Sequence, residues 1–450
     1  MSELSQLSKY IVDLQLKDVP EKVQQATVLH VLDTVGTALG ASQQEQIRRV
    51  SDSWLKRDDT RSIHVWGQNC KAGVSTAVFL NAMMGHTQEM DDVHTKSKTH
   101  IGTVVIPVAW GLAEYLGKCG QDFILAVICG YETMSRIGMA FGVSSHRNKG
   151  WHVTATAGTF GAAAACAKLL GLDAEQTTYA LGLAGAQSFG TWGFLGDGST
   201  NKVLNPARAA QVGMESAFLA QAGMTGPEHI LTAEDGGILA MMSDESDPTQ
   251  IVKDLGTVWQ SLYMDNKPYP SCRSTHCTID GTLALAKKYA IKAENVDHVE
   301  VDTYLVGYKQ CGVSEGSVRP RKPVHAKFSS QYTVACALLF GEVTLRQFKQ
   351  EVIDDPKVQE LVSRVIIRPA DEFTKVYPNH WGCTVRIYTK DGQEYEEYVK
   401  DASGSVDNPL TKEQVESKAI ALMKEICGEK AKTIAEEILG IMNLECMPEI

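Results

Sequence analysis

The sequence lacks the features that mark several classes of protein. It has no long run of lysine or arginine and a formal net charge of −11, so a basic face for nucleic acid is not expected. Its eleven cysteines include no Cys-x-x-Cys pair, which is typical of reduced thiols in a cytoplasmic protein. Residues 1–22 lack the apolar core of a signal peptide, and no stretch looks long and apolar enough to cross a bilayer. We therefore expect a cytoplasmic protein that binds neither nucleic acid nor membrane.

The length and composition indicate a globular protein with more than one core. A chain of 450 residues exceeds what one hydrophobic core usually supports, so two cores, or at most three, are expected. The hydrophobic share of 44% and the charged share of 22% are ordinary and give no sign of disorder. The acidity raises one question, because an anionic substrate would require a locally basic site.

The first 264 residues are predicted to form a body of packed helices. Apolar residues recur at helical spacing, and glycine and alanine are abundant where helices would meet, which lets the backbones approach closely. The predicted helices span residues 23–39, 73–84, 104–116, 123–137, 155–170, 174–185 and 207–222.

From residue 265 the pattern changes to a mixture of strands and helices. Strands are predicted at 295–305 and 365–368, and a hairpin at 384–389 and 394–399 around the Asp391-Gly392 turn. Helices are predicted at 277–289, 330–340 and 345–352. Residues 265–403 are thus expected to form an α+β domain with an antiparallel sheet.

Helical periodicity returns in residues 404–450, at 412–426 and 430–439. This last segment is expected to pack back on the first. The predicted fold is therefore mostly α, with a large all-helical domain formed by both chain ends (1–264 and 404–450) and an inserted, smaller α+β lid domain (265–403). The cleft between the two is the natural place for a site.

The first candidate cluster is the stretch Glu89-Met90-Asp91-Asp92-Val93-His94, followed by His100. Adjacent carboxylates beside imidazoles are unfavourable unless they are solvated, paired or used. Three interpretations remain open: a polar loop in which Asp92 caps a helix, a metal site, and part of an active site. A second metal motif is missing from the sequence, so no metal is expected.

The second candidate cluster is Gly150-Trp151-His152, which precedes a small-residue helix. An imidazole near a helix N-terminus has a depressed pKa and a location suited to an anion. A hydrogen-bonded core histidine explains the same pattern.

The third candidate lies at the predicted domain junction. Lys267, Tyr269, Cys272, Arg273 and His276 fall within ten residues that two prolines stiffen. A rigid junction with cations and acid/base groups suits carboxylate binding between domains. A plain linker is the alternative, and a Cys272 nucleophile with His276 as its base is a further, weaker one. Lys202, before another predicted helix, carries little signal alone.

Taken in order, these segments resemble the MmgE/PrpD family. The resemblance rests on the Glu89–His100 stretch, Gly150-Trp151-His152, Lys202, the segment from Lys267 to His276, and Ser329-Ser330-Gln331-Tyr332. It implies the two-domain fold described above and a homodimer without metal or organic cofactor. Known members include 2-methylcitrate dehydratase, cis-aconitate decarboxylase and iminodisuccinate epimerase, which all act on small polycarboxylates.

The resemblance also implies roles by position. The family's active-site acid falls on Glu89 or Asp91, its histidines on His100 and His152, its lysines on Lys202 and Lys267, and a tyrosine near its site on Tyr332. The chain departs from the family at Glu89, where several members have Asp, at Ile101-Gly102, where Pro often follows the histidine, and at Asn205-Pro206-Ala207, where His-x-Gly is common.

Proton abstraction beside a carboxylate explains why these residue types would act together. Extra negative charge develops on an anionic group, and preorganised cations stabilise it. The candidate cations are Lys202, Lys267, Arg273 and His100, and the candidate base is His152. His276 or Tyr332 would deliver a proton, and Glu89 and Asp91 would orient His100 or a cation.

The predicted function is a cofactor-independent lyase of a small di- or tricarboxylate, either a 2-methylcitrate- or citrate-type dehydratase or a cis-aconitate-type decarboxylase. An isomerase, such as an epimerase of iminodisuccinate, a non-catalytic protein that binds organic acids, and a metalloenzyme are the alternatives.

Overall fold

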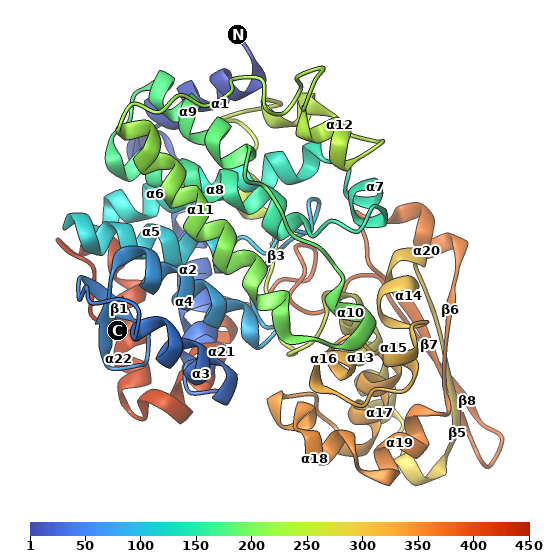
Figure 1. Ribbon diagram of the computed structural model, residues 1–450. Coiled ribbons are helices and arrows are strands. Elements are labelled where there is room, and N and C mark those ends of the chain that lie inside the picture. The colour runs from blue at the N-terminus through green and yellow to red at the C-terminus, as the bar shows by residue number, and fades with distance from the viewer.

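Both ends of the chain build one large helical body (Figure 1). The computed structural model describes residues 1–450. Near the N-terminus, α2 (Glu21–Ala41) packs against α21 (Lys412–Cys427) near the C-terminus. A Cβ on Gly36 would lie 2.8 Å from Ala419 Cα, and Lys418 Nζ lies 2.7 Å from Asp33 Oδ1. This close approach confirms the prediction that the C-terminal segment returns to the first domain.

The large body contains fourteen helices. They are α1 (Glu3–Asp13), α2, α3 (Glu45–Leu55), α4 (Val74–Thr87), α5 (Gly102–Leu116), α6 (Gly120–Ala140), α7 (Val143–Asn148), α8 (Val153–Leu170), α9 (Ala174–Gly185), α10 (Phe194–Asp197), α11 (Leu204–Gln221), α12 (Ile238–Met242) and α21, and α22 (Lys430–Leu439) follows at the end of the chain. The body also holds two short antiparallel ribbons, β1 (Ile63–Val65) with β2 (Cys70–Ala72) and β3 (Val93–His94) with β4 (Met264–Asp265). It is therefore not purely helical.

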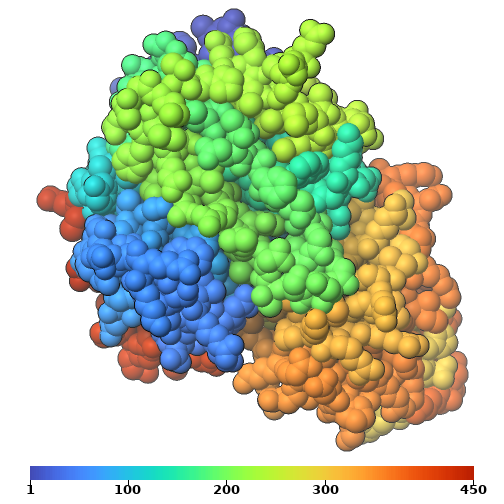
Figure 2. All heavy atoms as spheres, viewed as in Figure 1, coloured from blue at the N-terminus to red at the C-terminus, as the bar shows by residue number.

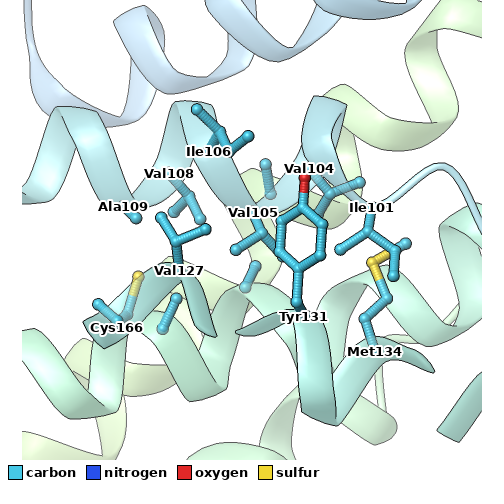
Figure 3. Close-up of a cluster of buried hydrophobic side chains, with 14 of the residues drawn as sticks. Ile101, Val104, Val105, Ile106, Val108, Ala109, Val127, Tyr131, Met134 and Cys166 are labelled. Atoms are coloured by element: carbon cyan, nitrogen blue, oxygen red, sulfur yellow. The ribbon is translucent and has the colours of Figure 1, made fainter. Parts of the chain in front are cut away.

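The centre of this body is formed by α5, α6 and α8, whose side chains interlock in Figure 3. Ala162 to Ala165 of α8 are fully buried, and a Cβ on Gly213 of α11 would lie 2.4 Å from Ala162 Cβ. By length and composition, α6 and α8 could each cross a membrane, so the expectation that no stretch could do so is wrong. Their most apolar windows are 94% and 89% buried inside the protein, as is typical of core helices.

The smaller domain is built on a four-stranded sheet of order β6-β5-β7-β8, seen edge-on at the right of Figure 1. The strands are β5 (Val296–Thr303), β6 (Val365–Pro369), β7 (Cys383–Thr389) and β8 (Glu394–Val399). The sheet is mixed, because β5 and β6 are parallel, and the predicted antiparallel sheet is corrected in this respect. The reason is the long helical connection between β5 and β6, which returns the chain to the same end of the sheet.

The helices of the smaller domain cover this sheet and the junction. They are α13 (His276–Lys288), α14 (Leu305–Cys311), α15 (Glu315–Val318), α16 (Pro323–Lys327), α17 (Ser330–Phe340), α18 (Gln350–Ile353), α19 (Pro356–Val362) and α20 (Asp371–Val376). The helix predicted at 345–352 is a 3-10 turn, Leu345–Phe348, followed by the short α18.

Two chain segments pass side by side between the domains. Asn266 N donates to Gly404 O at 2.8 Å, and Gly404 has a φ of +81°. Buried apolar residues form two main clusters, one from both chain ends and one from residues 277–402, and Figure 2 shows the latter as a separate lobe. The paired segments bring the loops of both domains to one place.

Gly404→Ala should lower the free energy of unfolding by about 3 kcal/mol or more, because a Cβ would lie 1.9 Å from Asn266 O. Gly392→Ala is the matched control, since Gly392 has a φ of +82° with no atom near its Cβ position. The control should lose only about 1 kcal/mol, the usual result of forcing alanine into the left-handed region. Urea unfolding followed by circular dichroism measures both values, and equal losses would contradict the packing argument.

Candidate active site

The loop between α4 and α5 holds the first predicted cluster. It pairs through β3 with β4, the strand that leads into the smaller domain. Asp92 is structural here: Oδ1 accepts from Gly102 N at 2.9 Å, at the start of α5, and Oδ2 accepts from Tyr131 OH at 2.7 Å. Burial raises the pKa of Asp92 to about 7. The interpretation of Asp92 as a helix cap therefore fits its position.

Asp91 lies between two imidazoles. Its Oδ2 is 2.6 Å from His86 Nδ1 and 2.9 Å from His100 Nδ1. Burial lowers the pKa of His100 and outweighs the opposing effect of Asp91, so that the pKa falls to about 3. Because Nδ1 lies next to the Asp91 carboxylate, the neutral ring favours a proton on Nδ1 and a lone pair on Nε2. Residues of both domains line a cavity at their junction. His100 lines this cavity, so it can act as a base there.

Glu89 lies between two lysines. One carboxylate oxygen pairs with Lys202 Nζ, and the other is 3.4 Å from Lys267 Nζ, which is also 3.8 Å from Asp91 Oδ1. Burial alone would raise the pKa of Glu89, but Lys202 and Lys267 hold it well below its usual range. Glu89 has a φ of +59°, a strained conformation that directs it into this ion-pair network. Lys202 and Lys267 both line the cavity as cations.

His152 lies beside this network but not on the cavity wall. Its ring centroid is 6.1 Å from that of His86, and its Nδ1 is 2.8 Å from Asn205 Nδ2. Because the same amide nitrogen points toward Thr191 O at 3.4 Å, it acts as the donor, and His152 Nδ1 accepts. The proton of the neutral ring then resides on Nε2, which is buried without a partner. This tautomer suits hydrogen-bond donation better than the predicted role of base.

The junction segment divides into cavity-lining and buried residues. Arg273 and Cys272 line the cavity, but Arg273 Nε already donates to Asp265 Oδ2 at 3.0 Å. His276 does not line the cavity, and its Nε2 is 3.2 Å from Ser271 O. A hydrogen bond with Cys311, more than any effect of His276, lowers the pKa of Cys272 to about 7. The position of His276 supports neither a proton-delivery role nor a base for Cys272.

Tyr332 is not brought to the cavity. It lies in α17 within the apolar cluster of the smaller domain, and its hydroxyl donates to Gln347 O. The Ser329-Ser330-Gln331-Tyr332 segment serves this core: Ser329 Oγ accepts from Tyr332 N and caps the helix. A proton-delivery role for Tyr332 thus has no support from its position.

Three residues near the site were missed by the sequence predictions. His86 lies in the apolar helix α4, and the signal available in the sequence was a histidine in a largely apolar helix. The structure shows this histidine to be fully buried. Lys98 and Arg147 line the cavity as well, and each reads in the sequence as an ordinary surface charge.

One group of side chains has the composition of a metal site. The donor atoms of His86, Asp91 and His100 lie within 4.8 Å of one another. His86 Nδ1 forms a hydrogen bond with Asp91 Oδ2, His100 Nδ1 lies 2.9 Å from the same oxygen, and Lys267 Nζ lies near the other oxygen. A metal ion there would displace the contacts of both imidazoles with Asp91 and would lie close to the positive charge of Lys267. The geometry therefore favours a network of side-chain contacts over a metal site.

Family models match nearly the whole chain. The MmgE/PrpD N-terminal domain matches residues 5–250, and the MmgE/PrpD C-terminal domain matches residues 269–442. The chain belongs to the MmgE/PrpD family. It is 26% identical to a cis-aconitate decarboxylase of Aspergillus terreus over 98% of this chain and 93% of the relative. It is 27% identical to the human cis-aconitate decarboxylase over 96% and 90%.

A cis-aconitate decarboxylase-like protein of Aspergillus oryzae is also similar, at 26% identity over 97% of this chain and 94% of the relative. The similarity of this MmgE/PrpD member to its relatives therefore extends through both domains.

Proposed function

We propose that the protein is a lyase that decarboxylates a small tricarboxylate of the cis-aconitate type without a metal or organic cofactor. The observation that carries the proposal is the cavity in which Lys202 and Lys267 flank Glu89 beside a neutral His100. The full-length similarity to cis-aconitate decarboxylases supports the choice of substrate class.

The chemistry requires stabilisation of an electron pair. When CO2 leaves a carbon next to a C=C bond, the pair from the broken C–C bond spreads through the allylic system toward a remaining carboxylate. Cations already directed at that carboxylate lower the barrier, usually by more than any other effect. Lys202 and Lys267 have this role, because their geometry is fixed by Glu89 and Asp91 before the substrate binds.

A proton must then reach carbon, so that a tricarboxylate and one proton give a dicarboxylate and CO2. His100 is the group with a free ring nitrogen at the cavity. A bound trianion raises the pKa of this imidazole, and Asp91 stabilises the imidazolium that forms. His100 Nε2 then delivers the proton to the allylic carbon.

Dehydration is the second candidate, and the low pKa of His100 in the free protein favours it. A neutral imidazole is ready to remove a proton beside a carboxylate, after which hydroxide leaves from the neighbouring carbon. The same cations would stabilise the intermediate charge.

The two reactions are separated by incubating the protein with cis-aconitate, citrate, 2-methylcitrate and iminodisuccinate in D2O, followed by mass spectrometry. The proposal expects CO2 and a dicarboxylate with one new C–D bond from cis-aconitate. Loss of water without CO2 from citrate or 2-methylcitrate would establish the dehydratase instead. No change in any of the four would overturn the assignment as a lyase of this class.

Turnover should persist after exhaustive treatment with EDTA, because His86 and His100 already occupy Asp91 and Lys267 opposes a cation. The measurement is the initial rate before and after chelation, with metal content followed by mass spectrometry. A loss of rate that one divalent metal restores would instead assign His86, Asp91 and His100 as its ligands.

A further inference from the structure

Two cations on the cavity wall have no acidic partner. The charges of Lys202 and Lys267 are balanced by Glu89 and Asp91, and that of Arg273 is balanced by Asp265. Lys98 and Arg147 line the same cavity and form no ion pair with any acidic side chain. The local excess of positive charge that an anionic substrate needs therefore comes from these two side chains.

Lys98 is held in an unusual environment. Its backbone has a φ of +58°, and its Nζ lies 3.8 Å from the centre of the Tyr377 ring and 5.7 Å from that of Trp381. The Nζ atom is buried and has no hydrogen-bond acceptor. Burial, and then Arg147, lower the pKa of Lys98 to about 7. Leaving an ammonium group buried without an acceptor destabilises the fold, which indicates that a ligand supplies the missing partner.

Arg147 approaches from a different element, the short helix α7. Its guanidinium lies 4.4 Å above the Trp192 ring, and burial lowers its pKa. Stacking uses the face of the guanidinium and leaves the N–H groups on its edge for an acceptor. The planar guanidinium group can donate two parallel hydrogen bonds to one carboxylate.

A shared neighbour connects this pair to the reacting end of the cavity. Burial lowers the pKa of both Lys98 and Arg147, and Cys272 partly opposes that effect in each. The hydrogen bond with Cys311 is the main cause of the lowered pKa of Cys272, and Lys267 adds to it. The side chains of Glu89, Lys98, Arg147, Lys267 and Cys272 all line one cavity. A molecule that contacts Lys202 and Lys267 thus lies within the same space as Lys98 and Arg147.

We propose that Lys98 and Arg147 form a second carboxylate subsite, which holds a carboxylate of the substrate that does not react. The inference rests on the proposed function for the identity of the ligand, and it adds a means of selecting tricarboxylates over dicarboxylates. Lys98 and Arg147 come from the large domain, whereas Tyr377 and Trp381, which cover Lys98, come from the smaller one. The subsite is therefore complete only when the two domains are in contact.

Isothermal titration calorimetry with two unreactive ligands tests the subsite. Tricarballylate and glutarate share a three-carbon chain and differ by one carboxylate, and neither has a hydroxyl group or C=C bond to react. The wild-type protein should bind tricarballylate about 10- to 100-fold more tightly than glutarate, the scale of one charge-assisted contact. Lys98→Met and Arg147→Met should each remove most of this preference, and Lys98→Arg should retain it.

Lys96→Met is the matched control, because Lys96 is in the same loop and lies 4.6 Å above the Tyr263 ring but does not line the cavity. It should bind both ligands as the wild type does. At pH 8 the wild type should also take up a proton when tricarballylate binds, since the ligand restores the charge of Lys98. Titrations in buffers of different ionisation enthalpy detect this uptake, and Lys98→Arg should abolish it.

Equal affinity of the wild type for the two ligands would overturn the subsite, as would an unchanged preference in folded Lys98→Met and Arg147→Met. If Lys98→Met does not fold, Arg147→Met and Lys98→Arg still decide the matter. Because both ligands are unreactive, these outcomes do not depend on turnover. Failure to convert cis-aconitate would reject the proposed reaction without affecting the binding result.

Discussion

Replacement of His100 by asparagine should lower kcat for the tricarboxylate by about 10²- to 10⁴-fold, the usual effect of losing a general acid/base group. The amide can keep a contact with Asp91 Oδ2, where His100 Nδ1 lies at 2.9 Å, but it cannot carry a proton between solvent and carbon. KM should change little, because Lys202 and Lys267 remain in place. Steady-state kinetics on the folded variant measure both constants.

His146→Gln is the matched control for His100→Asn. His146 lines the same cavity, but both ring nitrogens are occupied, Nδ1 at 3.3 Å from Met242 O and Nε2 at 2.8 Å from Thr156 Oγ1. Its replacement should affect stability more than kcat. A nearly normal kcat in His100→Asn would return the acid/base role to His152, which the sequence favours.

His100 and His152 show what the sequence can predict about the site and what it cannot. The order of the motifs identifies His100 and His152 as members of one site, and the structure places both rings near His86, with centroids at 4.7 Å and 6.1 Å. Which ring nitrogen is free depends on a partner distant in sequence: Asp91 for His100, and Asn205 for His152. No spacing rule contains that information, so the choice between His100 and His152 as the base stays a prediction that the His100→Asn variant tests.

The fold follows the sequence closely where local signals are strong. Helix α9 begins with the capping box of Asp173 and Gln176 and has the predicted limits, and α8 ends at Gly171 in the left-handed conformation. The parallel pairing of β6 could not be predicted, because periodicity defines a strand but not the direction of its neighbour. Lys98 and Arg147 were missed for a similar reason, since an isolated cation in a sequence is typical of a solvated surface.

The largest effect on stability is expected from Lys267→Met. Lys267 is fully buried, with Nζ at 3.4 Å from Glu89 Oε2 and 3.8 Å from Asp91 Oδ1. Its loss leaves buried negative charge with one cation fewer, so the free energy of unfolding at pH 7 should fall by about 3–5 kcal/mol. Lys71→Met is the control, because Lys71 is only partly buried and lies 3.9 Å from the exposed Glu449, a pair worth about 1 kcal/mol or less.

The pH dependence of Lys267→Met distinguishes loss of charge from loss of packing. In the wild type, Lys202 and Lys267 hold the pKa of Glu89 below its unfolded value despite burial, so this stabilisation is present above about pH 4 and is lost as the pH falls. In the variant, the pKa values of Glu89 and Asp91 in the folded state rise. The difference in stability between the variant and the wild type should therefore become smaller as the pH is lowered from 7 to 5. Lys267→Met/Glu89→Gln should regain part of the stability at pH 7 but not the activity. A stability deficit that is the same at every pH, and that Glu89→Gln does not reduce, would show that Lys267 acts through packing alone.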